Sequence, residues 1–314
     1  MGEVYGTDQR AIDGARLAVK ILSRDHMHDR DTITRFIEEG RTCIELSHPN
    51  IVRAFEVAVA ENGCPFIAME WLNGSPLATY MTGGGRVSLV HAASILRGIL
   101  AALDYAHRRG VVHRDLKPGN VFIQMADGGP FSVKLLDFGV AKILDGQKHT
   151  RTGALLGTPG YMSPEQIQSS RDVDPRTDLY SVGVLAYEML TGKPAFSAPT
   201  EYAKLAAVLS TTPTPAAQVD PALLPVSPFL EKAMQKDRAL RYQTANEMAQ
   251  ALEHALATSG IHADSVAIPT APSVQRPAYE TGPLPHEGAS TLAERRSERA
   301  GELAALGCGV ATVD

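Results

Sequence analysis

The chain has 314 residues, of which 44% are hydrophobic and 21% are charged, and its formal net charge is −5 at pH 7. This composition predicts a globular protein long enough for two lobes with a core each, and it excludes the basic surface typical of nucleic-acid binding. The three cysteines are Cys43, Cys64 and Cys308; their spacing excludes a disulfide framework or a zinc pattern and favours a cytoplasmic protein.

The sequence also predicts no membrane span. We find no apolar run of the roughly 18 residues that a spanning helix requires. The first ten residues, MGEVYGTDQR, lack the basic head and apolar core of a secretion signal.

Residues 1–72 have the pattern of a small antiparallel sheet with one helix. The helix extends from about Asp31 to Leu46, with Asp31 as its expected cap, and Gly40 within it costs about 1 kcal/mol relative to alanine. Alternating apolar positions between turn residues predict four strands, at residues 3–8, 16–22, 51–59 and 65–71.

Residues 73–258 are mainly helical. Residues 177–190 are apolar nearly all round and are therefore expected to be buried. A DGGP turn joins strands Val121–Gln124 and Phe131–Leu136 into a hairpin. Residues 259–314 contain five prolines among small polar residues, which is typical of a disordered tail. Other helices are predicted at residues 88–109, 200–210, 227–236 and 244–257.

The stretch HRDLKPGN, residues 113–120, carries a dense set of reactive side chains. Asn120 comes directly before the first hairpin strand and Asp137 directly after the second, so the two lie side by side at one mouth of the hairpin. Asp115 lies in the loop just before them. The side-chain oxygens of Asn120 and Asp137 are of the kind that Mg²⁺ prefers as ligands, and the carboxylate of Asp115 can accept a proton. Lys117 can neutralise charge on a transferring phosphate.

These motifs resemble those of the eukaryotic-like serine/threonine protein kinases of bacteria. HRDLKPGN matches the catalytic loop, which implies Asp115 as the base and Asn120 on a second Mg²⁺. DFG at 137–139 matches the turn whose Asp137 holds metal. Lys117, together with GTP at 157–159, resembles the serine/threonine branch rather than the tyrosine branch.

The resemblance also implies an ATP site. LAVK at 17–20 matches the strand whose lysine, Lys20, grips the α- and β-phosphates, and Glu39 falls where the family places its partner. The hinge whose backbone would meet adenine is formed by Met69, Glu70, Trp71 and Leu72. The residues implied to sandwich the adenine ring are Val4, Ala18 and Phe122.

The resemblance covers about residues 1–257 and implies an α+β, bilobal kinase fold with a small antiparallel-sheet N-lobe with one helix and a larger helical C-lobe. TPGYMSPE, residues 158–165, matches the end of the activation loop, with Ser163 where alanine is commoner. Glu165 would pair with Arg241, and Asp178 would brace the catalytic loop. The domains expected are 1–72, 73–258 and 259–314.

The function implied is ATP- and Mg²⁺-dependent phosphorylation of serine or threonine on proteins, including this chain itself through self-association. Two alternatives remain. A pseudokinase or scaffold would keep the fold without turnover, whereas a small-molecule phosphotransferase would lack GTPGYMSPE and the helices after it.

Regulation by phosphorylation is expected between DFG and SPE. This segment contains Thr150 and Thr152. A phosphate on either would add about −1.5 to −2 charges. That charge could pair with Arg114, next to Asp115, and order the loop.

The Gly-rich loop departs from the family pattern, because only its third glycine, Gly2, and its valine, Val4, are present. The family's first strand and first two glycines are absent. We expect this to expose the edge strand and to remove backbone donors to phosphate. The chain as written would then bind ATP weakly and turn over slowly.

Overall fold

The computed structural model describes residues 2–11, 14, 16–60, 63–125, 131–138, 159–169 and 172–259. Their contacts divide the chain into two compact units. The N-terminal unit holds the described residues up to Glu45 together with Arg53–Leu72. The helical unit holds Leu46–Val52 and the described residues from Asn73 onward. The predicted domain boundaries stay predictions, and Leu46–Val52 belongs by its contacts to the helical unit.

The N-terminal unit contains a four-stranded antiparallel sheet in the order β1-β2-β4-β3. The strands that the periodicity predicted are confirmed, with β3 starting three residues later than expected because Ile51 instead makes an isolated bridge to Leu135 of the helical unit. One face of the sheet forms an apolar core that includes Val19, Ile21 and Phe66. The strands are β1 (Gly2–Arg10), β2 (Arg16–Leu22), β3 (Ala54–Val59) and β4 (Pro65–Glu70).

One α-helix, α1 (Arg30–Glu45), packs against β3 and β4. The expectation that Asp31 caps it is wrong. The carboxylate of Asp29 accepts hydrogen bonds from the Asp31 amide at 3.1 Å and from the Thr32 hydroxyl at 2.7 Å, because Asp29 is the residue that precedes the first turn. Close packing explains Gly40, since a Cβ there would lie 2.8 Å from Cγ2 of Val57.

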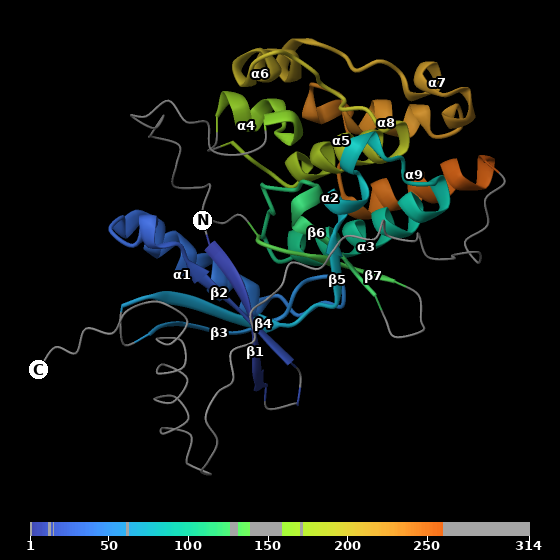
Figure 1. The fold of residues 1–314 in the computed structure, drawn as a ribbon. Coiled ribbons are helices and arrows are strands. Elements are labelled where there is room, and N and C mark those ends of the chain that lie inside the picture. The colour runs from blue at the N-terminus through green and yellow to red at the C-terminus, as the bar shows by residue number, and fades with distance from the viewer. Residues whose placement is uncertain are drawn as a thin grey trace, which may run out of the picture. The chain divides into compact units, whose positions relative to one another are not determined.

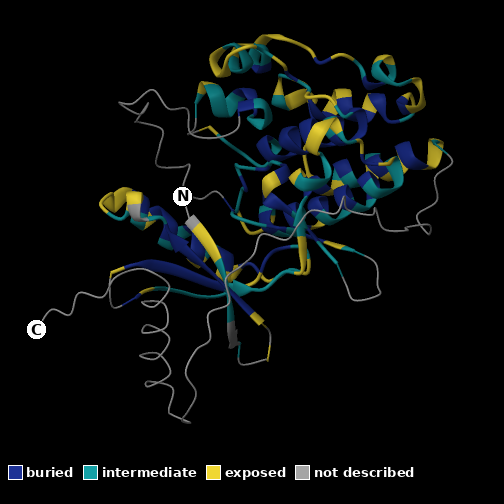
Figure 2. Ribbon diagram, in the orientation of Figure 1, coloured by how far each residue is buried: buried dark blue, intermediate teal, exposed yellow. Residues whose placement is uncertain are grey.

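The helical unit is built around α5 (Arg176–Thr191), which is buried on all sides as its sequence predicted (Figure 2). It contacts α3 and α8, and α9 packs along α3. Short segments escaped the sequence analysis, because elements of three to five residues carry no full period. The remaining helices are α2 (Leu77–Tyr80), α3 (Leu89–His107), α4 (Pro164–Gln168), α6 (Glu201–Ser210), α7 (Ala216–Val219), α8 (Ser227–Ala233) and α9 (Ala245–Thr258).

A three-stranded sheet completes the helical unit, in the order β5-β6-β7 (Figure 1). Its strands β6 (Val121–Gln124) and β7 (Ser132–Leu135) form the predicted hairpin, and β5 (Gly74–Pro76) adds an edge. The short 3-10 helices are η1 (Arg24–His26), η2 (Thr82–Gly84), η3 (Pro118–Asn120), η5 (Pro159–Tyr161), η6 (Pro221–Leu223) and η7 (Arg238–Leu240).

Helix α3 is long and apolar enough to cross a membrane by length and composition only. Half of its most apolar stretch is buried inside the helical unit, and the helix contacts β7, α5 and α9. Packing in the core therefore accounts for its apolar character.

Candidate active site

The catalytic-loop segment lies between α3 and β6, and Asp178 of α5 holds its backbone. The Asp178 carboxylate is fully buried and accepts hydrogen bonds from the amides of His113 and Arg114, both at 2.8 Å. Nε2 of His107 lies 2.8 Å from the same carboxylate. The backbone of Arg114 has a φ of 64°, which residues other than glycine rarely adopt. The hydrogen bonds to Asp178 therefore hold a strained backbone next to Asp115.

The charge of Asp178 is also fixed by its surroundings. Burial alone would raise its pKa, but the hydrogen bonds from His107 and from the backbone amide of His113 outweigh burial. The pKa therefore lies below its ordinary value, and the group stays a carboxylate that can accept all three bonds.

His113 connects the catalytic loop to the segment after the hairpin. Its Nδ1 accepts the Asp115 amide at 3.3 Å, and its Nε2 donates to the Leu136 carbonyl at 2.9 Å. Its ring lies 4.7 Å from that of Phe138, centre to centre. Burial lowers the pKa of His113, which favours the neutral ring that these two partners require.

Asp115 and Asn120 are joined directly. The Asn120 side-chain nitrogen donates to the Asp115 backbone carbonyl at 2.9 Å and to its carboxylate at 3.1 Å. Lys117 donates to the same carboxylate at 2.8 Å. Because the nitrogen of Asn120 is used in this way, its side-chain oxygen is left as the ligand atom.

Asn120 and Asp137 lie at one mouth of the hairpin, as the sequence predicted. The Leu136 amide donates to the Asn120 carbonyl at 2.9 Å, and Val121 is paired with Leu135 just inside. Asp137 has a φ of 48°, a second strained position in this segment.

These residues fit a magnesium ion that is shared with a phosphate. Among the described residues, no group of three or more His, Cys, Asp or Glu side chains could hold a metal by itself. Mg²⁺ needs no such cage, because it is usually bound by one or two carboxylates together with phosphate oxygens and water. Asp137 supplies the carboxylate and Asn120 a neutral oxygen, so the donor set suits this ion.

In the N-terminal unit, Lys20 of β2 donates to Glu39 of α1 at 3.0 Å. Both side chains are buried, with exposed fractions of 8% and 6%. Lys20 also lies 6.0 Å from the ring centre of Phe36. A buried ammonium held by one carboxylate keeps a fixed position, which is what a phosphate-binding lysine requires.

The residues expected around adenine have clear positions. Register places Val4 opposite Lys20, and places Ala18 opposite Met69. Ala18 is buried, whereas Val4 is half exposed. Phe122 belongs to β6 of the helical unit and pairs with Lys134 across the hairpin.

Two backbone amides of the hinge segment donate hydrogen bonds to carbonyls elsewhere in the N-terminal unit. The Glu70 amide donates to the Arg53 carbonyl and the Trp71 amide to the Arg16 carbonyl, both at 2.9 Å. No described residue accepts a hydrogen bond from the amide of Leu72.

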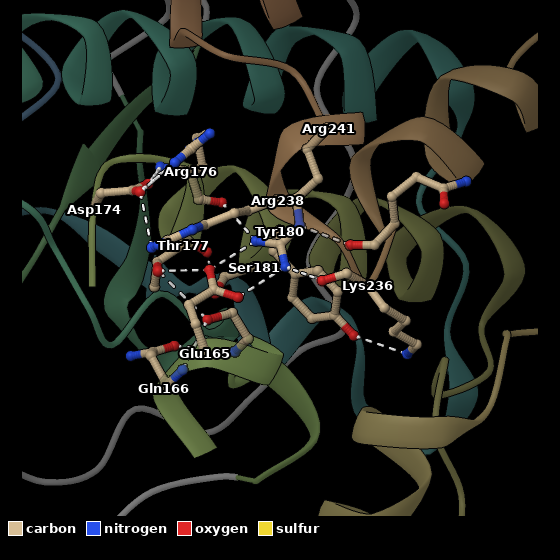
Figure 3. Close-up of polar contacts among 12 residues, drawn as sticks. Glu165, Gln166, Asp174, Arg176, Thr177, Tyr180, Ser181, Lys236, Arg238 and Arg241 are labelled. Atoms are coloured by element: carbon tan, nitrogen blue, oxygen red, sulfur yellow. Dashed lines mark hydrogen bonds and ion pairs between the residues drawn. The ribbon is translucent and has the colours of Figure 1, made fainter. Parts of the chain in front are cut away.

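The expected pair of Glu165 and Arg241 forms a bidentate ion pair in which the guanidinium is buried (Figure 3). The two parallel hydrogen bonds measure 2.7 and 2.8 Å. Three backbone carbonyls take the remaining guanidinium donors, so all five are satisfied. These carbonyls belong to Gln235, Arg176 and Lys236.

The contacts that connect this ion pair to the catalytic loop were not predicted from the sequence. Ser163 and Gln166 form a capping box at the start of α4, and the Gln166 side chain donates to the Arg114 carbonyl at 2.7 Å. The Thr177 hydroxyl donates to Glu165 at 2.8 Å. The spacing Ser-x-x-Gln is a known helix-start pattern and could have identified the capping box. His107 carries no comparable local signal.

Several predicted positions lie outside the described residues, namely Gly139, Thr150, Thr152, Gly157 and Thr158.

Burial lowers the pKa of Arg114. Its guanidinium makes no hydrogen bond or ion pair with any residue that the structure describes. Its pairing with a phosphothreonine stays a prediction.

Residues 1–256 match the family model for the protein kinase domain. The chain is 39% identical over 262 residues to the serine/threonine-protein kinase Pkn1 of Myxococcus xanthus, covering 82% of this chain and 37% of that protein. It is 36% identical over 258 residues to the serine/threonine-protein kinase PknA of Mycobacterium tuberculosis, covering 80% and 58%. The chain thus spans between about a third and three fifths of the length of these relatives.

A solved structure agrees with these relatives. The crystal structure of the Mycobacterium tuberculosis PknI kinase domain superimposes with a TM-score of 0.63 at 26% identity, covering 81% of this chain and 91% of that one. The kinase-like fold and the bacterial resemblance expected from the sequence are both confirmed. The family match over residues 1–256 shows that this chain belongs to the protein kinase domain family.

Proposed function

We propose that the chain is an ATP- and Mg²⁺-dependent protein kinase that phosphorylates serine and threonine hydroxyl groups. The observation that carries this proposal is the meeting of Asp115, Asn120 and Asp137 at the mouth of the β6–β7 hairpin, with the loop backbone fixed by Asp178. The relatives named serine/threonine-protein kinases support the same activity.

In this proposal Asp115 orients the acceptor hydroxyl and takes its proton. A positioned base contributes roughly 10² to 10⁴ in rate. Lys117, 2.8 Å from the Asp115 carboxylate, is close enough to stabilise charge on the transferred phosphoryl group. When bound at Asn120 and Asp137, Mg²⁺ would neutralise charge on the phosphates.

The N-terminal unit would hold the nucleotide. Lys20, fixed by Glu39, binds phosphate oxygens, and the amide of Leu72, which bonds to no acceptor among the described residues, can donate to the adenine edge. Transfer to Thr150 or Thr152 of another copy would make self-phosphorylation part of the activity. Mass mapping of phosphate on an incubated sample tests that step, and an activation segment without phosphate in an otherwise labelled chain would reject it.

The test of the main proposal is transfer of radiolabelled phosphate from ATP to a generic basic protein. We expect Asp115→Asn to lower kcat by roughly 10² to 10⁴ with little change in the KM for ATP. Asp104→Asn is the matched control, because Asp104 forms only a surface pair with Arg108. Nucleotide binding without any transfer by the wild-type chain would indicate a scaffold instead.

A further inference from the structure

The sheet of the N-terminal unit has a face that carries Lys20. Side chains alternate along a strand, and cross-strand partners share a face. The register Gly6–Ala18–Met69 therefore places these three positions on the same face as Lys20, one alternate position further along β2. Because glycine has no side chain and alanine has only a methyl group, little side-chain volume covers the sheet at Gly6 and Ala18.

Trp71 lies over this part of the sheet. A Cβ on Gly6 would lie 2.6 Å from Cζ3 of the Trp71 indole, which shows that the ring rests on the backbone of β1. Two further contacts hold Trp71 in place. Its amide donates to the Arg16 carbonyl at 2.9 Å, and the Arg16 guanidinium lies 4.7 Å from the indole centre.

We propose that Trp71 is a positioning residue for the nucleotide base. Its side chain extends from the segment after β4 to Gly6 of β1, on the face that carries Ala18 and Lys20, and so fixes β1 relative to Glu70 and Leu72. This proposal rests on the proposed function, because it assigns the base of ATP to that face.

In this proposal the base lies near Ala18 and the phosphates lie near Lys20, at different positions along β2. Ala18 and Lys20 are two residues apart, which is roughly 7 Å in a strand. Trp71 contacts Gly6, the cross-strand partner of Ala18, and Lys20 occupies the next alternate position of β2. Displacement of the indole should therefore weaken binding of the base and leave binding of the phosphates unchanged.

Three variants displace the indole in different ways. Gly6→Ala places a methyl group where the ring lies, Trp71→Leu removes the ring, and Arg16→Ala removes the stacked cation. Arg53→Ala is the matched control, because the Arg53 guanidinium lies at the same 4.7 Å from a different ring, that of Phe55, and alanine keeps the backbone groups that pair with Glu70.

Three quantities are measured for each variant. They are the Kd of MgADP by calorimetry, the affinity of inorganic tripolyphosphate from its competition with MgADP, and the separate values of kcat and of the KM for MgATP. We expect Gly6→Ala and Trp71→Leu to raise the Kd of MgADP and the KM of MgATP roughly tenfold, with kcat at saturation kept. Arg16→Ala should have a smaller effect in the same direction. Tripolyphosphate affinity and the Arg53→Ala variant should match the wild type.

Trp71 is the sole tryptophan of the chain, so its fluorescence reports on the contact without any nucleotide. Gly6→Ala and Arg16→Ala should shift its emission, and Arg53→Ala should not. If the wild type binds MgADP and the Gly6 and Trp71 variants bind it within twofold, the proposal is overturned and the proposed function stands. A wild-type chain that binds no nucleotide overturns both. An equal loss of tripolyphosphate binding would overturn the assignment to the base.

Discussion

Arg241 donates two parallel hydrogen bonds to Glu165 across 76 residues of sequence, and its guanidinium is completely buried. The ring of Tyr180 lies 4.8 Å from that guanidinium. Hydrogen bonds and the charge of Arg241 outweigh the effect of burial and hold the pKa of Glu165 below its ordinary value. The pair joins α4 to the segment that precedes α9.

Loss of the guanidinium fork of Arg241 should be costly. Arg241→Lys offers three donors in place of five and cannot bind the carboxylate with a planar fork. Buried acceptors are then left without a donor, and we expect the free energy of unfolding to fall by roughly 1 to 3 kcal/mol, measured by urea denaturation. Arg238→Lys is the control, because Arg238 forms a partly exposed pair with Asp174, and the substitution should cost about 1 kcal/mol or less. Equal costs for the two variants would contradict this account.

The same pair predicts a dependence on pH. Because the pKa of Glu165 is lowered on folding, its contribution is fully present above the ordinary value of 4.5 and is lost as pH falls through the folded pKa. The stability difference between the wild type and Glu165→Gln should therefore shrink on acidification below that value. A difference that stays constant over the acidic range would be inconsistent with a depressed pKa.

Asp178→Asn should impair catalysis through the backbone. An amide has one acceptor oxygen, and its NH₂ group would face an N–H of His113 or Arg114. We expect a stability loss of roughly 1 to 3 kcal/mol and a fall in kcat of about 10²-fold as Asp115 moves, with the KM for ATP nearly unchanged. Asp174→Asn serves as the control for kcat. Retention of full kcat in Asp178→Asn would argue against this positioning role.

Lys236 should make the protein more stable as pH rises. Its ammonium donates to the Val208 carbonyl at 2.6 Å and lies 4.2 Å from the ring centre of Phe196. Burial and the charge of Arg241 lower its pKa from 10.5 to about 8. Between these values the unfolded chain binds more protons than the folded chain, so the free energy of unfolding contributed by Lys236 increases with pH.

A comparison of variants isolates this contribution from other titrating groups. The stability of the wild type relative to Lys236→Met should increase between pH 8 and pH 10.5. Lys236→Arg keeps its charge throughout, so its stability relative to Lys236→Met should stay flat. Parallel curves for lysine and arginine at this position would refute the lowered pKa.

Gly40→Ala should destabilise the N-terminal unit despite the better helix propensity of alanine. Alanine gains about 1 kcal/mol in a helix. The added Cβ would lie 2.8 Å from Cγ2 of Val57 and 3.0 Å from Cγ1 of Ile67, and such overpacking costs typically 1 to 3 kcal/mol. Any shift of α1 also moves Glu39 relative to Lys20.

A double-mutant cycle tests this explanation by urea denaturation. Val57→Ala removes the closest contact, Cγ2 at 2.8 Å, but leaves Cβ of residue 57 and Cγ1 of Ile67 at 3.0 Å, so Gly40→Ala should cost less in that background than in the wild type. A stabilising effect of Gly40→Ala in the otherwise wild-type chain would show that the close packing does not matter.

Local patterns were enough to predict most elements. Apolar residues recur with the period of a helix in α3 and α9, because each helix buries one face. Strand β2 is apolar at nearly every position, because it is buried on both faces. The meeting of Asn120 and Asp137 also followed from the sequence, since the two strands of a hairpin must run side by side. The family motifs then indicated partners such as Arg241 for Glu165.

Contacts between distant segments could not be predicted in this way. His107 meets Asp178 across 71 residues, and Trp71 rests on Gly6, although neither sequence context carries a period or spacing that signals the contact. The sequence by itself determined the elements, the order of the motifs and the hairpin mouth, because these depend on neighbours along the chain. Only the tertiary structure decided which buried donor meets which acceptor, and where a glycine makes room for another element, because these depend on packing between elements.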